Sequence, residues 1–119
     1  VIFTNIEGQK KSLICEVADS LYKRQRGLMY RNHLNDDEGM IFVYKNPAKI
    51  NFWMKNTNIP LSIAFIDENG YIININQMYL NSDKRFTSPQ KFKYAVETNL
   101  GWFKNNFIRA GTKVEFITP

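Results

Sequence analysis

The stretch "LSIAFIDENGYIININQMY" (residues 61–79) decides how the fold is interpreted. Its first half is a nearly continuous apolar run, which is typical of a buried strand. The turn "DENG" follows, because Asp and Gly favour a tight reversal of the chain. The second half alternates between apolar and polar residues, so it predicts a strand that pairs back on the first. We expect its inward residues to be Ile73 and Ile75 and its outward residues to be Asn74 and Asn76.

Turn signals recur about every ten residues on both sides of this hairpin, which is the rhythm of a mainly-β domain. The further predicted strands are residues 1–4, 12–18, 40–44, 50–54, 94–98 and 113–118. The first two form an opening hairpin around Gly8. A short helix begins after Asp19 or Ser20 and stops at Gly27, and a second helix lies within residues 99–108. The sequence thus predicts a mainly-β (α+β) fold, a small closed or partly open β-barrel or sandwich of about eight short strands with two short helices.

Composition and charge indicate a single globular domain and argue against a disordered chain or a membrane-spanning helix. The chain of 119 residues suits one domain, residues 1–119, and its 44% hydrophobic content is that of a globular protein rather than a disordered one. No apolar run approaches the roughly 18 residues of a membrane-spanning helix. The net charge of +5 favours anionic partners. Nucleic acid is not the expected partner, because the basic residues are scattered apart from Lys23, Arg24, Arg26 and Arg31.

The sequence offers few residues for nucleophilic or metal chemistry. It has neither a glycine-rich phosphate loop nor a GxSxG motif. Cys15 lies among apolar neighbours, which raise a thiol pKa rather than activate the thiol, so a Cys15–His33 dyad is not expected. One cysteine and one histidine do not supply the usual zinc ligands. We therefore predict no metal and no cofactor.

The stretch "NFWMKNTNIPL" (residues 51–61) is the leading candidate for a binding site. Trp53 offers an aromatic face, Lys55 a cation, and Asn56 and Thr57 an amide and a hydroxyl. This combination often lines sites for carbohydrates and small anions. The alternative is that Asn56 and Thr57 only shape the turn, by bonding to nearby backbone.

Glu97 is the second candidate, because "YAVETNLG" (residues 94–101) places it in a strand that is otherwise suited to burial. A buried carboxylate needs a cationic or hydrogen-bonding partner, for which Arg26 and Lys55 are candidates. The alternative is that Glu97 points to solvent. A raised pKa in a concave pocket would favour a general base, whereas a closed ion pair with Arg26 would favour a structural role.

Copper is a more distant alternative. Thioethers bind Cu(I), and Met54 beside Trp53, together with His33, would supply suitable ligand types. Methionine is chiefly a filler of hydrophobic cores, however.

Five segments occur together in an order and spacing that resemble a known family: "RGLMYR", "GMIFVY", "FWMKNTNIPLSIAFID", "AVETNLG" and "AGTKVEF". The chain is identified, over about residues 17–116, as a member of the uncharacterised bacterial and archaeal family known as domain of unknown function 192. The resemblance implies a small mainly-β domain but no established reaction. Relatives usually carry Asp after "IPL", whereas this chain has Ser62. Glu97 and Arg26 match the family pattern.

Two classes of function stay open. The first is a non-catalytic binding module for a small anionic or carbohydrate-type ligand, and its candidate residues are Arg26, Trp53, Lys55, Asn56, Thr57 and Glu97. The second is a hydrolase or transferase in which Glu97 is the general base and Lys55 or Arg26 stabilises an anion. Many relatives look exported, so the resemblance implies a periplasmic or secreted location without excluding the cytoplasm. A monomer is the default expectation.

Overall fold

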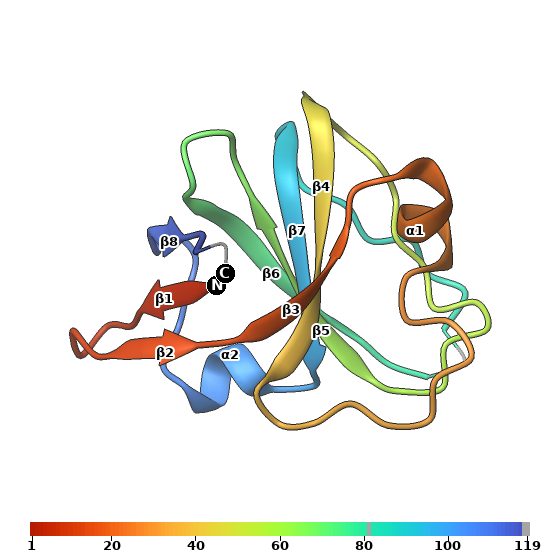
Figure 1. Cartoon of the computed structure of the whole chain (residues 1–119), viewed down its shortest axis with the longest axis horizontal. Coiled ribbons are helices and arrows are strands. Elements are labelled where there is room, and N and C mark those ends of the chain that lie inside the picture. Colours follow the sequence, from red (N-terminus) through yellow and green to blue (C-terminus); the bar gives the residue numbers. More distant parts are fainter. Residues whose placement is uncertain (81, 118–119) are drawn as a thin grey trace.

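The computed structural model describes residues 1–80 and 82–117, and these contain eight strands in two sheets together with two short helices (Figure 1). The predicted mainly-β class is confirmed. The two sheets do not close into a barrel, and the arrangement is that of a sandwich. No helix in the described part of the chain is long and apolar enough to cross a membrane.

The larger sheet has the strand order β3-β4-β7-β5-β6. Its strands are β3 (Ile14–Ala18), β4 (Glu38–Ala48), β7 (Phe92–Asn99), β5 (Leu61–Ile66) and β6 (Ile72–Met78). β3 runs parallel to β4, and the other neighbours are antiparallel. The predicted hairpin is confirmed as β5 and β6.

The smaller sheet has the order β2-β1-β8 and consists of β1 (Ile2–Thr4), β2 (Lys10–Ser12) and β8 (Val114–Glu115). The hairpin around Gly8 is confirmed, but its second strand is Lys10–Ser12 and not residues 12–18 as predicted. Ser12 ends β2, and the chain then leaves the small sheet to pair with β4 in the large one.

The first helix, α1 (Leu21–Arg26), begins and ends where its capping residues predict. The side-chain oxygen of Ser20 accepts a hydrogen bond from the backbone N–H of Lys23 at 3.2 Å. Gly27 ends the helix with a positive φ of 49°, which glycine adopts at little cost. The second helix, α2 (Trp102–Asn105), is one turn long.

The strand predicted at residues 50–54 is wrong. Phe52 makes only an isolated bridge with Phe86, with N–O distances of 2.7 and 2.8 Å. Among the described residues this pairing extends no further, so the segment is a loop that packs against the core of the large sheet. Its side chains are buried unevenly: Met54 is buried, Phe52 is half-buried and Trp53 is exposed.

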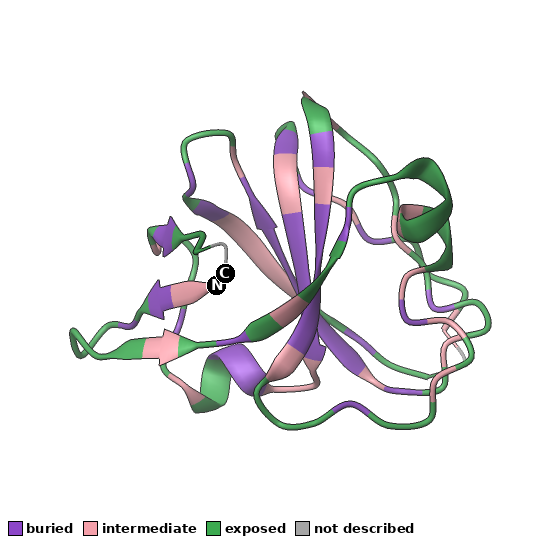
Figure 2. Ribbon diagram, in the orientation of Figure 1, coloured by how far each residue is buried: buried purple, intermediate pink, exposed green. Residues whose placement is uncertain are grey.

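The large sheet packs on both faces, and Figure 2 shows β4 and β7 buried over much of their length. We call one face the closed face. Its core is covered by α2 and the small sheet, and includes Phe3, Ile41, Ile66, Val96 and Phe103. We call the other the open face. It is covered by α1 and long loops, and its core includes Met40, Phe42, Met54, Phe65 and Ala95.

The two-sided packing corrects the expected alternation in β6. Residues 73–76 are all half-buried, so Asn74 and Asn76 do not simply face solvent. Ile73 packs against the open-face core and Ile75 against the closed-face core. The register of β5 and β6 shifts between Phe65 and Ile66, which explains why the two isoleucines do not share a side.

Candidate functional site

A cavity of about 480 Å³ lies on the open face, between the large sheet, α1 and the loop that carries the "NFWMKNTNIPL" stretch. Apolar side chains form most of its wall, and a few polar groups converge on it. The polar and aromatic lining residues that matter for its chemistry are Arg24, Arg26, Tyr44, Trp53, Thr57 and Glu97. A concave, largely apolar site of this size with few polar groups is typical of small-molecule binding sites.

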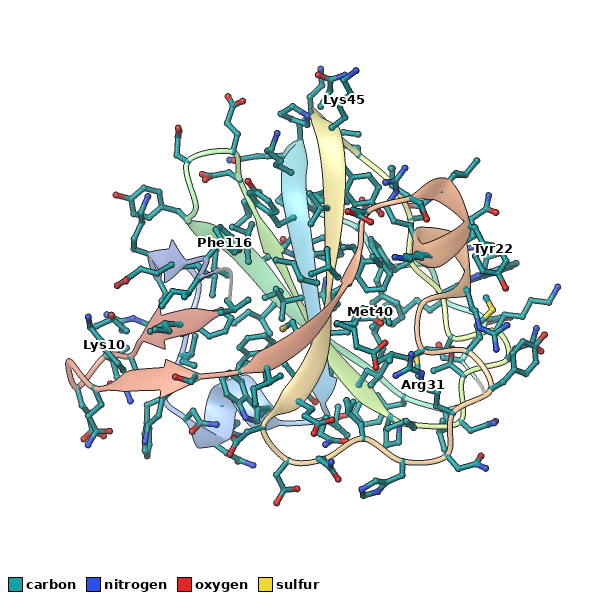
Figure 3. The ribbon with its side chains drawn as sticks, viewed as in Figure 1. Lys10, Tyr22, Arg31, Met40, Lys45 and Phe116 are labelled. Atoms are coloured by element: carbon teal, nitrogen blue, oxygen red, sulfur yellow. The ribbon has the colours of Figure 1, made fainter. Side chains whose placement is uncertain are left out.

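Glu97 lies within the sheet, at the side of the cavity formed by β7. In register it stands opposite Met40 of β4 and Ile63 of β5, so its side chain points to the open face among apolar neighbours (Met40 is labelled in Figure 3). Only 5% of the residue is exposed. Burial raises the pKa of its carboxyl from 4.5 to about 8, because the apolar surroundings disfavour the charged form. The alternative in which Glu97 points to solvent is therefore wrong.

The expected cationic partner of Glu97 is also absent within residues 1–80 and 82–117. The ion pairs there are Lys10–Glu115 at 3.8 Å and Arg31–Glu16 at 2.6 Å. Arg26 lines the same cavity but forms no ion pair with Glu97. Its guanidinium lies over the ring of Tyr30 instead, with Cζ 5.5 Å from the ring centroid.

Tyr44 and Arg24 line the same cavity as Glu97, and neither was among the predicted site residues. Arg24 Cζ is 4.9 Å from the Tyr44 ring centroid, and its Nη1 donates to the carbonyls of Asp19 and Val43 at 2.9 and 3.1 Å. Burial raises the pKa of Tyr44 to about 12, with Arg24 lowering it and Glu97 raising it. The alternation of β4 places Tyr44 on the same face as Met40. The residue opposite Glu97 is Met40, however, and Tyr44 lies four residues further along the strand.

A second hollow of about 420 Å³ adjoins the cavity, and we call it the outer hollow. Trp53 and Thr57 line both spaces, whereas Lys55 and Asn56 line only the outer one. The six predicted residues are thus divided between two neighbouring spaces: Arg26 and Glu97 in the cavity, Lys55 and Asn56 in the outer hollow, and Trp53 and Thr57 at their boundary.

Trp53 is 41% exposed, and two positively charged side chains lie over its ring in cation–π contacts. Arg85 Cζ lies 4.1 Å from a ring centroid of the indole, and Lys55 Nζ lies 5.2 Å from it. Arg85 lies in the loop between β6 and β7. Its contact with Trp53 depends on how that loop folds back, so the sequence carries no local signal for it.

Asn56 and Thr57 fulfil the structural role that was the alternative to binding. Asn56 adopts a left-handed conformation with φ of 57°, which Asn tolerates better than most residues. Its carbonyl accepts from the backbone N–H of Tyr30 at 2.8 Å, and its side-chain amide donates to the Tyr30 hydroxyl at 3.0 Å. The N–H of Thr57 closes the turn on the carbonyl of Met54 at 3.1 Å. These bonds tie the "RGLMYR" segment to the "NFWMKNTNIPL" segment.

The remaining candidates lie outside this arrangement. Cys15 is half-buried, and burial raises the pKa of its thiol to about 11. His33 Nε2 lies 2.8 Å from Asn35 Oδ1 on an exposed loop. Met54 is 4% exposed in the open-face core and also lines the outer hollow, whereas Met29 lines the cavity. Among the residues that the structure describes, no three His, Cys, Asp or Glu side chains gather as a metal site.

Ser62, which stands where relatives usually carry Asp, lies on the closed face. It is 2% exposed, and its hydroxyl accepts a hydrogen bond from the N–H of Gly101 at 2.9 Å, just before α2. In register Ser62 stands opposite Thr98, the residue after Glu97. Neighbouring residues of a strand point to opposite faces, so the side chains of Ser62 and Glu97 lie on different faces of the sheet. The departure from the family pattern therefore leaves the cavity intact.

Two solved structures are similar to this chain over nearly its whole length. One is a protein of Sinorhizobium meliloti 1021 described as a proposed transcription regulator, with 30% identity, a TM-score of 0.92, and coverage of 96% of this chain and 89% of that one. The other is a protein of unknown function from Novosphingobium aromaticivorans DSM 12444, with 31% identity, a TM-score of 0.91, and coverage of 97% and 82%. No curated protein matches. The family model of domain of unknown function 192, described as "Uncharacterized ACR", matches residues 2–116, and the chain therefore belongs to this family.

Proposed function

We propose that this chain binds a small anionic molecule, which enters the cavity and forms a hydrogen bond with the carboxyl of Glu97. The observation that carries the proposal is that Glu97 is buried, faces the cavity, and has no ion-pair partner within the described residues. Burying a carboxyl among apolar side chains without a charged partner costs stability. An apolar side chain at this position would avoid that cost.

The protonation state of Glu97 defines what it offers to a ligand. With a pKa of about 8, the carboxyl is mostly neutral at pH 7. A neutral carboxyl donates one hydrogen bond and accepts others, so it suits a carbonyl, hydroxyl or amide group of the ligand. Arg24 and Arg26 on the same wall add positive potential, which favours a ligand with a negative charge.

The carbohydrate-type ligand has weaker support than the anion. A sugar ring stacks on an aromatic face, and Trp53 is the exposed aromatic residue between the two spaces. Arg85 and Lys55 already lie over its ring at 4.1 and 5.2 Å. A ligand that meets the charges rather than the ring fits this arrangement better.

A titration of the whole chain tests binding. The probes are hexanoate, hexyl phosphate, glucuronate and glucose 6-phosphate, and the readouts are amide chemical shifts in a ¹H–¹⁵N spectrum and the melting temperature. We expect at least one anion to shift the amides of Gly27, Thr57 and Glu97 and to raise the melting temperature. The response should weaken in Glu97→Leu, which removes both the donor and the acceptor, and persist in Glu115→Leu, a matched change of an exposed carboxylate on β8. No response to any probe, or equal responses in both variants, would contradict the proposal.

Acid–base catalysis by Glu97 is the second candidate function, and the raised pKa is the observation that favours it. A general acid or base works best when its pKa lies near the operating pH. Tyr44 and Arg24, which line the same cavity, could hold a reacting group and stabilise developing negative charge. If a bound probe is turned over, the rate should change through pH 8 and vanish in Glu97→Gln without loss of the fold. A rate that survives in Glu97→Gln excludes this role.

A further inference from the structure

We infer that the outer hollow is an anion subsite, in which Lys55 and Arg85 hold the charged group of a ligand whose remaining part, largely apolar with a polar group for Glu97, occupies the cavity. The inference rests on the proposed function and makes it more specific. It assigns the ligand to amphipathic monoesters of phosphate or to carboxylic acids, with a chain or ring of moderate size.

The first step is the geometry of the two spaces. Trp53 and Thr57 line both the cavity and the outer hollow, so the spaces meet at these two residues. A molecule with two different ends can therefore occupy both at once. The wall of the cavity includes Leu28, Met29, Phe42 and Phe52, which suit an apolar end.

The second step is the charge of the outer hollow. Lys55 and Arg85 both lie over the ring of Trp53, which places two positive charges at the same opening. Neither forms an ion pair within residues 1–80 and 82–117. Two cations at one opening repel each other, and an anion bound in the hollow relieves that repulsion. The lining also contains Asp83, which lowers the net positive charge without cancelling it.

The third step is the comparison with the arginines of the cavity. Arg24 is committed to two backbone carbonyls, at 2.9 and 3.1 Å, and Arg26 lies over Tyr30. Arg85 donates to one carbonyl, that of Asp83 at 3.0 Å, and so keeps most of its donors for a ligand. Lys55 adds a flexible ammonium that lines the same hollow. The outer pair is therefore better placed to hold a charged group.

The test measures affinity by calorimetry for hexyl phosphate, hexanoate, hexanol and inorganic phosphate, with the full chain. We expect the two amphipathic anions to bind more tightly than hexanol and inorganic phosphate. The double variant Lys55→Gln, Arg85→Gln should lose about tenfold or more in affinity for the anions, because a hydrogen bond to a charged group is among the stronger ones. Its affinity for hexanol should not change. The indole N–H signal of Trp53, identified by its loss in Trp53→Phe, should shift with the anions.

A matched variant of the cavity separates the two proposals. If Arg26→Gln lowers the affinity for hexyl phosphate and the double variant does not, the anion lies in the cavity. The subsite is then wrong although the proposed function stands. If inorganic phosphate binds as tightly as hexyl phosphate, the ligand does not use both spaces, and the inference also fails. If no probe binds the unaltered chain, the proposed function fails together with the subsite.

Discussion

The two faces of the large sheet are built from the same strands and do different things. On the closed face, Phe3, Trp102 and Phe103 meet edge to face, with ring centroids 5.4–5.6 Å apart. On the open face, Phe42 and Phe65 make similar contacts with Phe52, at 5.1 and 5.6 Å, but Phe52 is only half-buried and forms part of a cavity wall. Neither the cavity nor the outer hollow is lined by a residue of the closed-face core.

The contrast is sharpest at two consecutive residues of β7. Val96 points to the closed face and is fully buried among hydrocarbon side chains. Glu97 points to the open face and is almost as buried, yet carries a carboxyl that no cation neutralises within the described residues. The closed face thus follows the rules that maximise stability, whereas the open face departs from them beside a cavity. Such local departures are expected at functional sites.

The largest difference should appear when one phenylalanine is truncated on each face. Phe103→Ala removes a fully buried ring from the closed face, and we expect a loss of about 3–5 kcal/mol in the free energy of unfolding. Phe52→Ala should cost less than half as much, because Phe52 is half-buried and already faces the cavity. Urea denaturation of both variants at one pH measures the two values. Equal losses would show that the open face is packed as tightly as the closed one.

The next effect is a dependence of stability on pH that comes from Glu97. Its pKa is about 8 in the folded chain and 4.5 ordinarily, so between these values the folded state holds a proton that the unfolded state has released. Stability should therefore fall as the pH rises from 4.5 to 8, by about 1.4 kcal/mol per pH unit, and level off above pH 8. From pH 5 to pH 7 this amounts to roughly 2–3 kcal/mol.

Urea denaturation between pH 5 and pH 9 measures this slope, and Glu97→Gln should remove it because an amide does not titrate. Glu115→Gln is the matched control, since Glu115 is exposed on the small sheet, and it should keep the slope. If the unaltered chain and Glu97→Gln show the same dependence on pH, the carboxyl of Glu97 is solvated or paired in the folded protein.

Features that depend on neighbours in sequence could be predicted. The hairpin of β5 and β6 follows from its turn and its apolar runs, and α1 from Ser20 and Gly27. Features that depend on which segments meet in space could not. The parallel pairing of β3 with β4, and the bridge between Phe52 and Phe86, join segments whose sequences carry no mark of their partners.

The same division holds for the candidate site. Glu97 was predictable, because a carboxylate in an otherwise apolar strand is a local anomaly. The "NFWMKNTNIPL" stretch was also recognisable from its composition. The family resemblance, confirmed over residues 2–116, could not say whether that stretch serves the fold or a ligand. Its contacts show that the stretch does both: Asn56 stabilises the turn by hydrogen bonds to Tyr30, whereas Trp53 and Lys55 line the outer hollow. Tyr44 and Arg85 were missed because only the folded chain brings them to these residues.

The smallest expected effect on stability comes from the ion pair that joins the loop over the open face to the large sheet. Arg31, in the loop after α1, pairs with Glu16 on the edge strand β3 through two hydrogen bonds of 2.6 Å (Arg31 is labelled in Figure 3). Hydrogen bonding from Arg31 lowers the pKa of Glu16, so the contribution of the pair is present at neutral pH and is lost as the pH falls through that lowered pKa. The pair is largely exposed, so Arg31→Ala should cost only about 0.2–1 kcal/mol, and less in high salt. A double-mutant cycle with Glu16→Gln, measured by urea denaturation at two salt concentrations, isolates the interaction free energy of the Arg31–Glu16 pair.

A loss of several kcal/mol would mean that α1 and the loops over the open face unfold together with the core. The contrast between the two faces would then be smaller than their packing suggests.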